Sequence, residues 1–278
     1  MIPVSAEILT TIGPFPITNA YVNSTIMTAL FVIFAFVLNR RLSPRPGKLQ
    51  VAFESLLGVL FGYFDQVTGD REKSKKFLPL VGTMFLFILC CNWFGLLPGT
   101  GTVGIQRGAE FIPFLRSANS DLNLTLAMAL ISVIGSNLLG MFTLGFFVHW
   151  NKFIQLGSLW RAVKTLDPMK VFVGLIEFAV GIIELISEFA KIISLSLRLF
   201  GNVFAGEVLM SVIASLVSFA VPLPFMFLEL IVGVIQATVF AMLTLVYLTV
   251  MSAKPHGATH EDEYGAAEAD AIEHNALA

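Results

Sequence analysis

The sequence predicts an all-α polytopic membrane protein with five membrane crossings and one amphipathic surface helix. Composition, apolar runs and the distribution of charge lead to this prediction. Of the 278 residues, 56% are hydrophobic and 13% are charged, whereas soluble domains carry about 25% charged residues. With a mean hydropathy of +0.83, the chain cannot cover its own surface with polar groups in water, which excludes a soluble enzyme. Its 26 phenylalanines exclude intrinsic disorder.

Five apolar runs are each long enough to cross a bilayer, which takes about 20 residues. They cover residues 20–38, 77–97, 122–148, 171–218 and 225–251. The segment 49–64 carries apolar residues near helical spacing but is short and charged, so we expect an amphipathic helix at the membrane surface. Residues 70–76 read as a solvated turn, and a polar tail covers 252–278. We expect residues 1–278 to form a single membrane domain.

The basic residues predict the orientation of the chain, because cytoplasmic loops are enriched in lysine and arginine. With the N-terminus outside, two basic residues fall in outer loops, Arg107 and Arg116. Thirteen fall inside: Arg40, Arg41, Arg45, Lys48, Arg71, Lys73, Lys75, Lys76, Lys152, Arg161, Lys164, Lys170 and Lys254. We therefore expect the N-terminus outside and the C-terminus in the cytoplasm.

A polar stripe runs along the apolar segment 171–218. As one straight helix this segment would be about 72 Å long, while the hydrocarbon is only about 30 Å thick. The helix must then tilt steeply or bend, and Gly201 and Gly206 offer places to bend. Six polar residues follow each other at steps of three, four or seven and so share one helical face: Glu177, Glu184, Glu188, Lys191, Arg198 and Asn202.

Arg198 is the member of this stripe hardest to explain by structure alone. No acid lies three or four residues away on its own helix, and an uncompensated charge in mid-membrane costs at least ~2.5–3.5 kcal/mol. Arginine stays protonated, so it suits holding a carboxylate rather than relaying a proton. Lys191, in contrast, can pair with Glu184 or Glu188, and such a pair could simply hold helices together.

The last apolar run carries one charge, Glu229. A carboxylate in hydrocarbon tends to exchange its proton, which a relay group needs. Gln236 and Tyr247 share its helical face. Hydrogen bonding between helices explains these two residues as well as a role in an ion path does. Glu207 lies about half a turn round the helix from Arg198 and should face a different neighbour. Carboxylates on both sides of a fixed cation indicate an interrupted ion path, with the exchanging acid on a partner subunit.

The motif Ser196-Leu197-Arg198-Leu199-Phe200-Gly201-Asn202 resembles the signature of subunit a of F-type ATP synthases. Residues 92–99, 120–125 and 229–237 also resemble that family, and the likeness covers roughly residues 20–252. The resemblance implies a non-catalytic stator subunit that conducts protons and needs no cofactor or metal. Its expected partners are the c-subunit ring, the peripheral-stalk b subunits, other synthase subunits and the lipid bilayer, with no nucleic acid. The expected location is the bacterial cytoplasmic membrane.

The resemblance also implies roles for single residues. Arg198 would separate two half-channels and attract the ring carboxylate. The last two helices, long and tilted, would cradle the ring. The other matching positions are Asn202 and Gln236 near Arg198, Glu207 and Glu229 in the outer half-channel, Glu184, Lys191 and Ser194 toward the inner half-channel, and Asp121 and Asn123 at the outer mouth.

One departure concerns the outer pair, because many family members have one acid and one histidine where this chain has Glu207 and Glu229. Two neighbouring carboxylates would titrate as a coupled pair. The sequence leaves open whether the ion is H⁺ or Na⁺. The main alternative function is a secondary transporter of a small solute, but the paired repeats typical of transporters are absent. An intramembrane hydrolase is disfavoured, because there is no HExxH-type spacing and no nucleophile–base pair.

Overall fold

The computed structural model describes residues 8–12, 15–41, 46–97, 104–107, 110–113, 116–146, 168–216 and 222–252. Helices dominate these ranges: α1 (Asn19–Arg41), α2 (Lys48–Thr68), α3 (Arg71–Gly95), α4 (Leu122–Leu144), α7 (Pro168–Leu216) and α8 (Pro222–Ser252), with a short 3₁₀ turn η1 (Ala118–Ser120). The predicted tail beyond Ser252 and the end of the third apolar run, 147–148, lie outside these residues.

Four helices are long and apolar enough to cross a membrane, judged over the described part of the chain. They are Asn19–Arg40, Arg71–Gly95, Leu122–Thr143 and Pro222–Ser252. They correspond to the first, second, third and fifth predicted runs. α7, which corresponds to the fourth predicted run, is not among the four helices, so a membrane crossing by α7 stays a prediction. α7 is one continuous helix of 49 residues that runs through Gly201 and Gly206. Of the two expected alternatives, a broken helix or a tilted one, the structure has no break.

Two short hairpins add strands that the all-α prediction did not include. β1 (Ile8–Ile12) pairs antiparallel with β2 (Phe15–Thr18), and β3 (Gly104–Arg107) pairs antiparallel with β4 (Glu110–Pro113). Both precede membrane-type helices rather than interrupting them. The first hairpin follows from β-branched residues on both sides of a Gly-Pro pair. Strands of four or five residues are too short to stand out beside the apolar runs.

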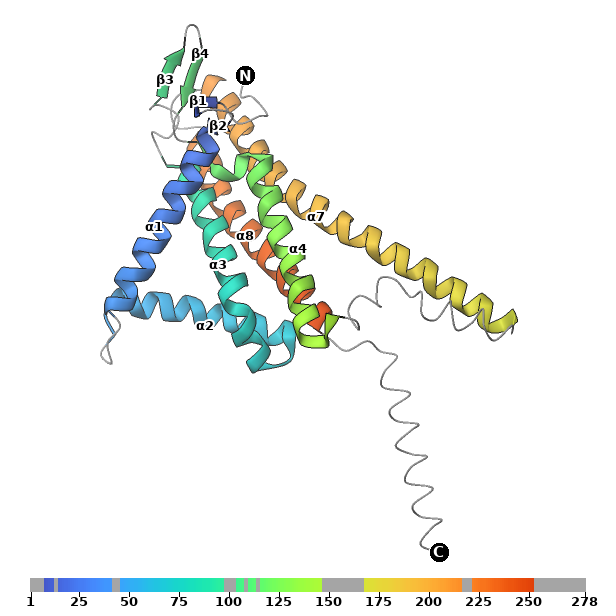
Figure 1. The fold of residues 1–278 in the computed structure, drawn as a ribbon. Coiled ribbons are helices and arrows are strands. Elements are labelled where there is room, and N and C mark those ends of the chain that lie inside the picture. Colours follow the sequence, from blue (N-terminus) through green and yellow to red (C-terminus); the bar gives the residue numbers. More distant parts are fainter. Residues whose placement is uncertain are drawn as a thin grey trace, which may run out of the picture. The chain divides into compact units, whose positions relative to one another are not determined.

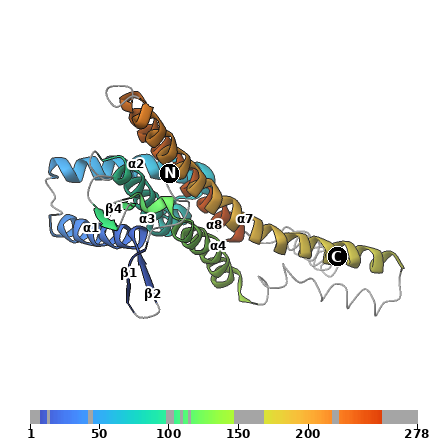
Figure 2. The same cartoon turned by 90° about the horizontal axis from the view of Figure 1, so that it is seen from above.

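The chain divides into two compact units, and each is described by itself. The first holds residues 1–135 and 188–247, and the second holds 136–187 and 248–278. In the first unit α3 packs against α1 and α2, and α2 lies crosswise between the end of α1 and the start of α3 (Figure 1). Hairpin β1–β2 lies beside the start of α1 (Figure 2). Apolar side chains under 2% exposed fill this unit: Phe64, Val81, Ile88, Leu195, Leu199, Phe240 and Leu245.

In the second unit the described residues are the helical parts 136–144, 168–187 and 248–252, together with 145–146. Leu248 and Met251 are buried there, with exposures of 0% and 2%. Serine hydroxyls in this unit bond back to their own helices: Ser187 Oγ donates to the Ile183 carbonyl over 2.8 Å, and Ser252 Oγ to the Leu248 carbonyl over 2.6 Å. Such bonds satisfy hydroxyls on apolar helices without another partner.

The corner between α2 and α3 corrects the prediction of a solvated turn over 70–76. α2 ends at Gly69, whose positive φ of 65° forms a left-handed cap. Asp70 then caps α3, because its side chain accepts a hydrogen bond from the Glu72 backbone N–H over 2.8 Å. Helix α3 therefore begins at Arg71, six residues before the predicted span.

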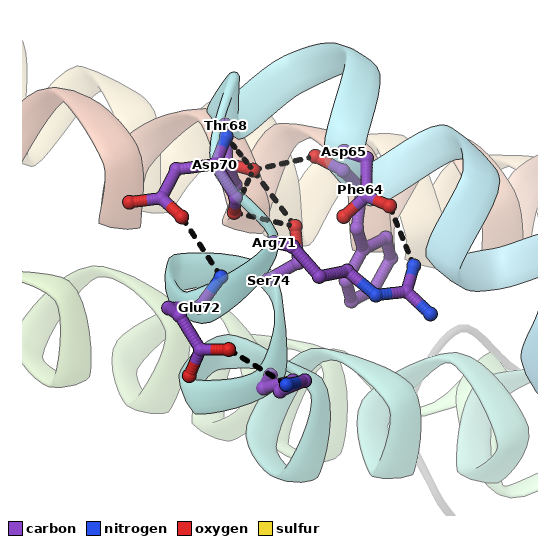
Figure 3. A network of polar contacts seen from close by, with 8 residues as sticks. Phe64, Asp65, Thr68, Asp70, Arg71, Glu72 and Ser74 are labelled. Carbon is purple, nitrogen blue, oxygen red and sulfur yellow. Dashed lines mark hydrogen bonds and ion pairs between the residues drawn. The ribbon is translucent and has the colours of Figure 1, made fainter.

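Side-chain contacts hold this corner together (Figure 3). The buried hydroxyls of Thr68 and Ser74 lie 2.8 Å apart, and Arg71 Nη1 lies 2.5 Å from Asp65 Oδ2. A hydrogen bond from Ser74 and the guanidinium of Arg71 lower the pKa of Asp65 below its ordinary value of 3.8. The predicted surface helix 49–64 is thus part of the longer α2. Its place on a membrane surface stays a prediction.

Candidate functional site

Helix α7 carries Arg198 on its outward face. The preceding Leu195 and Ser196 and the following Leu199 are each no more than 1% exposed, so the packed side of the helix lies there. Arg198 itself is exposed, and so are Ser194, Leu197, Gly201 and Ala205. Within the described part of the chain, Arg198 makes no hydrogen bond or ion pair, although its charge acts on Tyr247. A permanent cation thus projects from a stripe that is mostly apolar or small.

Glu207 and Glu229 come together from different helices. Glu207 lies on α7 and Glu229 on α8, and the two charges interact. Between them lies Gly206, where an added Cβ would overlap the carboxylate of Glu229. The Glu229 carboxylate thus occupies the space that a side chain at position 206 would take, and it would have to turn away from an added Cβ. The resemblance had placed these two acids in one half-channel, and the geometry brings them together.

A buried polar segment joins this acid pair. Each residue of the run 116–121, Arg-Ser-Ala-Asn-Ser-Asp, is at most 9% exposed. Arg116 Nε lies 2.9 Å from Glu207 Oε2. Ser117 and Ser120 also lie near the Glu207 carboxylate. The orientation count placed Arg116 in an outer loop, which stays a prediction; in the structure its side chain is buried and paired with Glu207.

Polar contacts fix the position of this segment against α1, α3 and α8. The Asn23 side chain on α1 donates to the Arg116 carbonyl. Ser117 Oγ donates to the Cys91 carbonyl on α3 over 3.2 Å. Asn119 Nδ2 donates to Asn92 Oδ1 over 2.7 Å, and Asn92 Nδ2 donates to the Gly233 carbonyl on α8 over 3.3 Å. Buried amides therefore connect three separate elements and orient Arg116 toward Glu207.

A second charged group lies on α7 before Arg198. Lys191 Nζ lies 2.5 Å from Glu188 Oε1, and Glu188 is only 8% exposed. Lys191 Nζ also lies 5.2 Å from the centre of the Tyr247 ring on α8. Glu188, one of the two acids expected to pair with Lys191, therefore lies beside it. Glu184 belongs to the second unit and is not placed relative to this group.

The remaining predicted residues occupy varied positions. Asp121 is buried and accepts hydrogen bonds from the Asn123 backbone and side chain over 3.0 and 3.2 Å, at the start of α4. Asn123 and Ser194 are exposed, and Asn202 is partly buried. Gln236 is 8% exposed, and its Nε2 has no partner among the described residues. The side chain of Glu177 lies outside the described part.

Sequence reasoning missed Arg116 because a loop arginine was expected to be solvated. The available signal was its neighbourhood: five of the six residues from 116 to 121 are polar or charged and immediately precede an apolar helix. No group of three or more His, Cys, Asp or Glu residues that could hold a metal ion occurs among the residues searched. Cys90 and Cys91 are free thiols, and Cys91 is 1% exposed.

A sequence model of the family described as ATP synthase A chain matches residues 21–249. The chain belongs to the ATP synthase subunit a family. It is 31% identical over 237 residues to ATP synthase subunit a of Moorella thermoacetica, which covers 85% of this chain and 92% of that protein. It is 35% identical over 225 residues to ATP synthase subunit a of Desulfotalea psychrophila, covering 80% and 79%.

A third relative is named ATP synthase subunit a, sodium ion specific, from Propionigenium modestum. It is 30% identical over 248 residues, covering 88% of this chain and 78% of that protein. As a member of this family, the chain is a multi-pass membrane protein of the F-type ATP synthase with a role in ion translocation. The secondary-transporter and hydrolase alternatives are therefore set aside.

Proposed function

We propose that this subunit a is the non-catalytic stator of a rotary F-type ATP synthase, and that it conducts protons through two half-channels that meet at Arg198. The observation that carries the proposal is the exposed, unpaired guanidinium of Arg198 on α7, within the described part of the chain. A permanent cation facing outward in an apolar helix requires an anion from elsewhere. A carboxylate of a neighbouring c-subunit ring would supply that anion.

The small residues beside Arg198 support this contact. Gly201 and Ala205 follow it on the same exposed stripe, and an added Cβ at Gly201 would meet no atom of this chain within 4 Å. Small residues let a partner helix approach closely in a membrane. Arg198 would then attract the deprotonated ring carboxylate and block protons from passing directly between the half-channels, because a mobile proton meets a positive barrier there.

Two groups of polar residues would form the half-channels. Glu207, Glu229, Asp121 and Asn123 belong to the proposed outer half-channel, and Glu184, Lys191 and Ser194 to the proposed inner one. Asn202 and Gln236 lie on the same two helices as Arg198 and Glu229. In this arrangement α7 makes the fourth of five crossings, the N-terminus is outside and the C-terminus is in the cytoplasm of a bacterium. The b subunits of the peripheral stalk are the second proposed partner.

The test replaces Arg198 with alanine in the whole ATP synthase, reconstituted in liposomes. We expect proton-driven ATP synthesis to be abolished while the complex still contains the c-ring. The matched control is Ile193→Ala, which truncates an exposed apolar side chain of the same helix, 56% exposed. Undiminished synthesis in the assembled Arg198→Ala complex would contradict the proposed mechanism.

The ion itself is tested separately. The proposed ion is the proton, because Glu207 and Glu229 can exchange protons without further ligands. The relative from Propionigenium modestum is named sodium ion specific, so Na⁺ is the alternative ion that the experiment must test. Synthesis driven by a pH gradient in sodium-free buffer is expected, and a strict requirement for Na⁺ would overturn the choice of ion.

A further inference from the structure

The last turn of α3 donates two side-chain hydrogen bonds to the backbone of α8. Asn92 Nδ2 donates to the Gly233 carbonyl over 3.3 Å. Trp93 Nε1 donates to the Leu230 carbonyl over 3.2 Å. A Cβ at Gly233 would lie 3.3 Å from Asn92 Cβ and 3.5 Å from Trp93 Cδ1, so the two helices approach closely at this point. Because Leu230 directly follows Glu229 in the sequence, these bonds hold the turn of α8 that carries this acid.

The same turn of α3 also contacts the buried segment 116–121, which reaches the other acid of the pair. Asn92 Oδ1 accepts a hydrogen bond from Asn119 Nδ2 over 2.7 Å, so one amide bonds to both the segment and α8. Arg116, at the start of this segment, has its Nε 2.9 Å from Glu207 Oε2. The end of α3 therefore supports both elements through which the two acids are held.

These bonds are not easily replaced by others. Asn92 is 7% exposed, so water is not at hand for an amide that loses its acceptor. An indole N–H in apolar surroundings likewise depends on a protein acceptor. Further along α8 there is a separate contact, in which Ser132 Oγ on α4 donates to Thr244 Oγ1 over 2.8 Å. Loss of the α3 contacts would therefore free the turn near Glu229 and leave the contact near Thr244 in place.

We propose that Asn92 and Trp93 are positioning residues that hold the Glu229 carboxylate in its place beside Gly206. This inference rests on the proposed function and deepens it, because it assigns the end of α3 a part in building the outer half-channel. Neither an amide nor an indole titrates in the pH range of the cell, so both side chains act through the backbone of α8 and not on the ion itself. The family-like stretch 92–99 thereby gains a physical task for its first two residues.

The first measurement is proton-driven synthesis by the whole ATP synthase in liposomes, per complex that contains subunit a and the c-ring. Trp93→Phe keeps an aromatic ring without the N–H, and Asn92→Ala removes the amide. Each is expected to lower the rate about threefold, and Asn92→Ala/Trp93→Phe about tenfold, because each removes a hydrogen bond to α8. The matched control on α3 is Thr83→Ala, whose hydroxyl donates to carbonyls of its own helix. Its rate should stay within about twofold of the original.

The second measurement reports the place of residue 229 without any proton conduction. A Gly206→Cys/Glu229→Cys pair is oxidised in the assembled complex, because the Glu229 carboxylate lies where a Cβ at 206 would be. The reference is Ser132→Cys/Thr244→Cys, where the natural hydroxyls are 2.8 Å apart. Since a disulfide needs Cβ atoms about 3.5–4.5 Å apart, adding Asn92→Ala/Trp93→Phe should slow the 206–229 disulfide about tenfold and the reference less than about twofold. Mass spectrometry of the digested subunit identifies which thiols are linked.

An unchanged 206–229 disulfide rate in the presence of Asn92→Ala/Trp93→Phe would overturn the inference. Equal slowing of both disulfides would overturn it too, because α8 would then have loosened as a whole. Full synthesis despite a slowed 206–229 disulfide, or a complex that fails to assemble, would likewise contradict a positioning role. Failure of the proposed function has another signature, undiminished synthesis in assembled Arg198→Ala, and the disulfide rates do not depend on that result.

Discussion

The carboxylate of Glu229 on α8 lies against the backbone of Gly206 on α7, in the space that a side chain at position 206 would occupy. A Cβ at 206 would overlap both oxygens of that carboxylate. The overlapped atoms are the end of a flexible side chain, so an added Cβ would turn the carboxylate away from its place beside α7. The observed position of the Glu229 carboxylate beside α7 thus depends on the missing side chain at Gly206.

We predict that Gly206→Ala lowers proton-driven ATP synthesis severalfold while the complex still assembles, because the added Cβ displaces the Glu229 carboxylate from its place beside α7. Gly62→Ala on α2 is the matched control, since nothing lies within 4 Å of its added Cβ. The measurement is synthesis rate in liposomes per assembled complex. An equal effect of both substitutions would contradict the role assigned to Gly206.

Asn119 connects the buried segment to α3, where its Nδ2 donates to the Ile88 carbonyl and to Asn92 Oδ1. Asn119→Ala leaves both acceptors without this donor, which costs about 1–3 kcal/mol. We therefore expect a lower thermal unfolding temperature of the detergent-solubilised subunit. Asn39→Ala, at an exposed position of α1, should leave that temperature nearly unchanged. Equal unfolding temperatures for the two variants would show that the amide contributes nothing.

Tyr247 presents its ring to the ammonium group of Lys191, 5.2 Å from the ring centre. Tyr247→Leu is expected to destabilise the packing of α7 on α8 by about 0.5–2 kcal/mol, the range of cation–π contacts. Tyr247→Phe keeps the ring face and should retain most of the stability. Chemical denaturation of the solubilised subunit compares the two. If Phe were as destabilising as Leu, the hydroxyl and not the ring would matter.

The corner between α2 and α3 is expected to respond to acid through Asp65. Its folded-state pKa is lowered, so its stabilising contribution is present above the ordinary value of 3.8 and is lost as the pH falls through the lower folded-state value. Asp65→Asn should remove this dependence and raise amide hydrogen exchange at Gly69 even at neutral pH. Glu54→Gln, on the same helix, serves as the control. A protection factor of the Gly69 amide that falls with acid in Asp65→Asn as it does in the original chain would contradict the role of Asp65.

Much of the fold followed from periodicity and hydropathy alone. The four spans in α1, α3, α4 and α8 agree with predicted runs because about 20 apolar residues have few alternatives to a membrane helix. The helical continuity of 168–216 also agrees with the steps of three, four and seven along it. Helix ends were less accurate: capping by Asp70 moved the start of α3 to Arg71, which hydropathy does not register.

The sequence by itself determined the family motif, the isolation of Arg198 from acids on its own helix, and the two acids on the last two helices. Only the tertiary structure decided which charges meet. It placed Arg116 beside Glu207, paired Glu188 with Lys191, and set Glu229 against Gly206. Periodicity fixes which face of one helix a residue occupies, whereas contacts between residues about 90 positions apart depend on how separate elements pack.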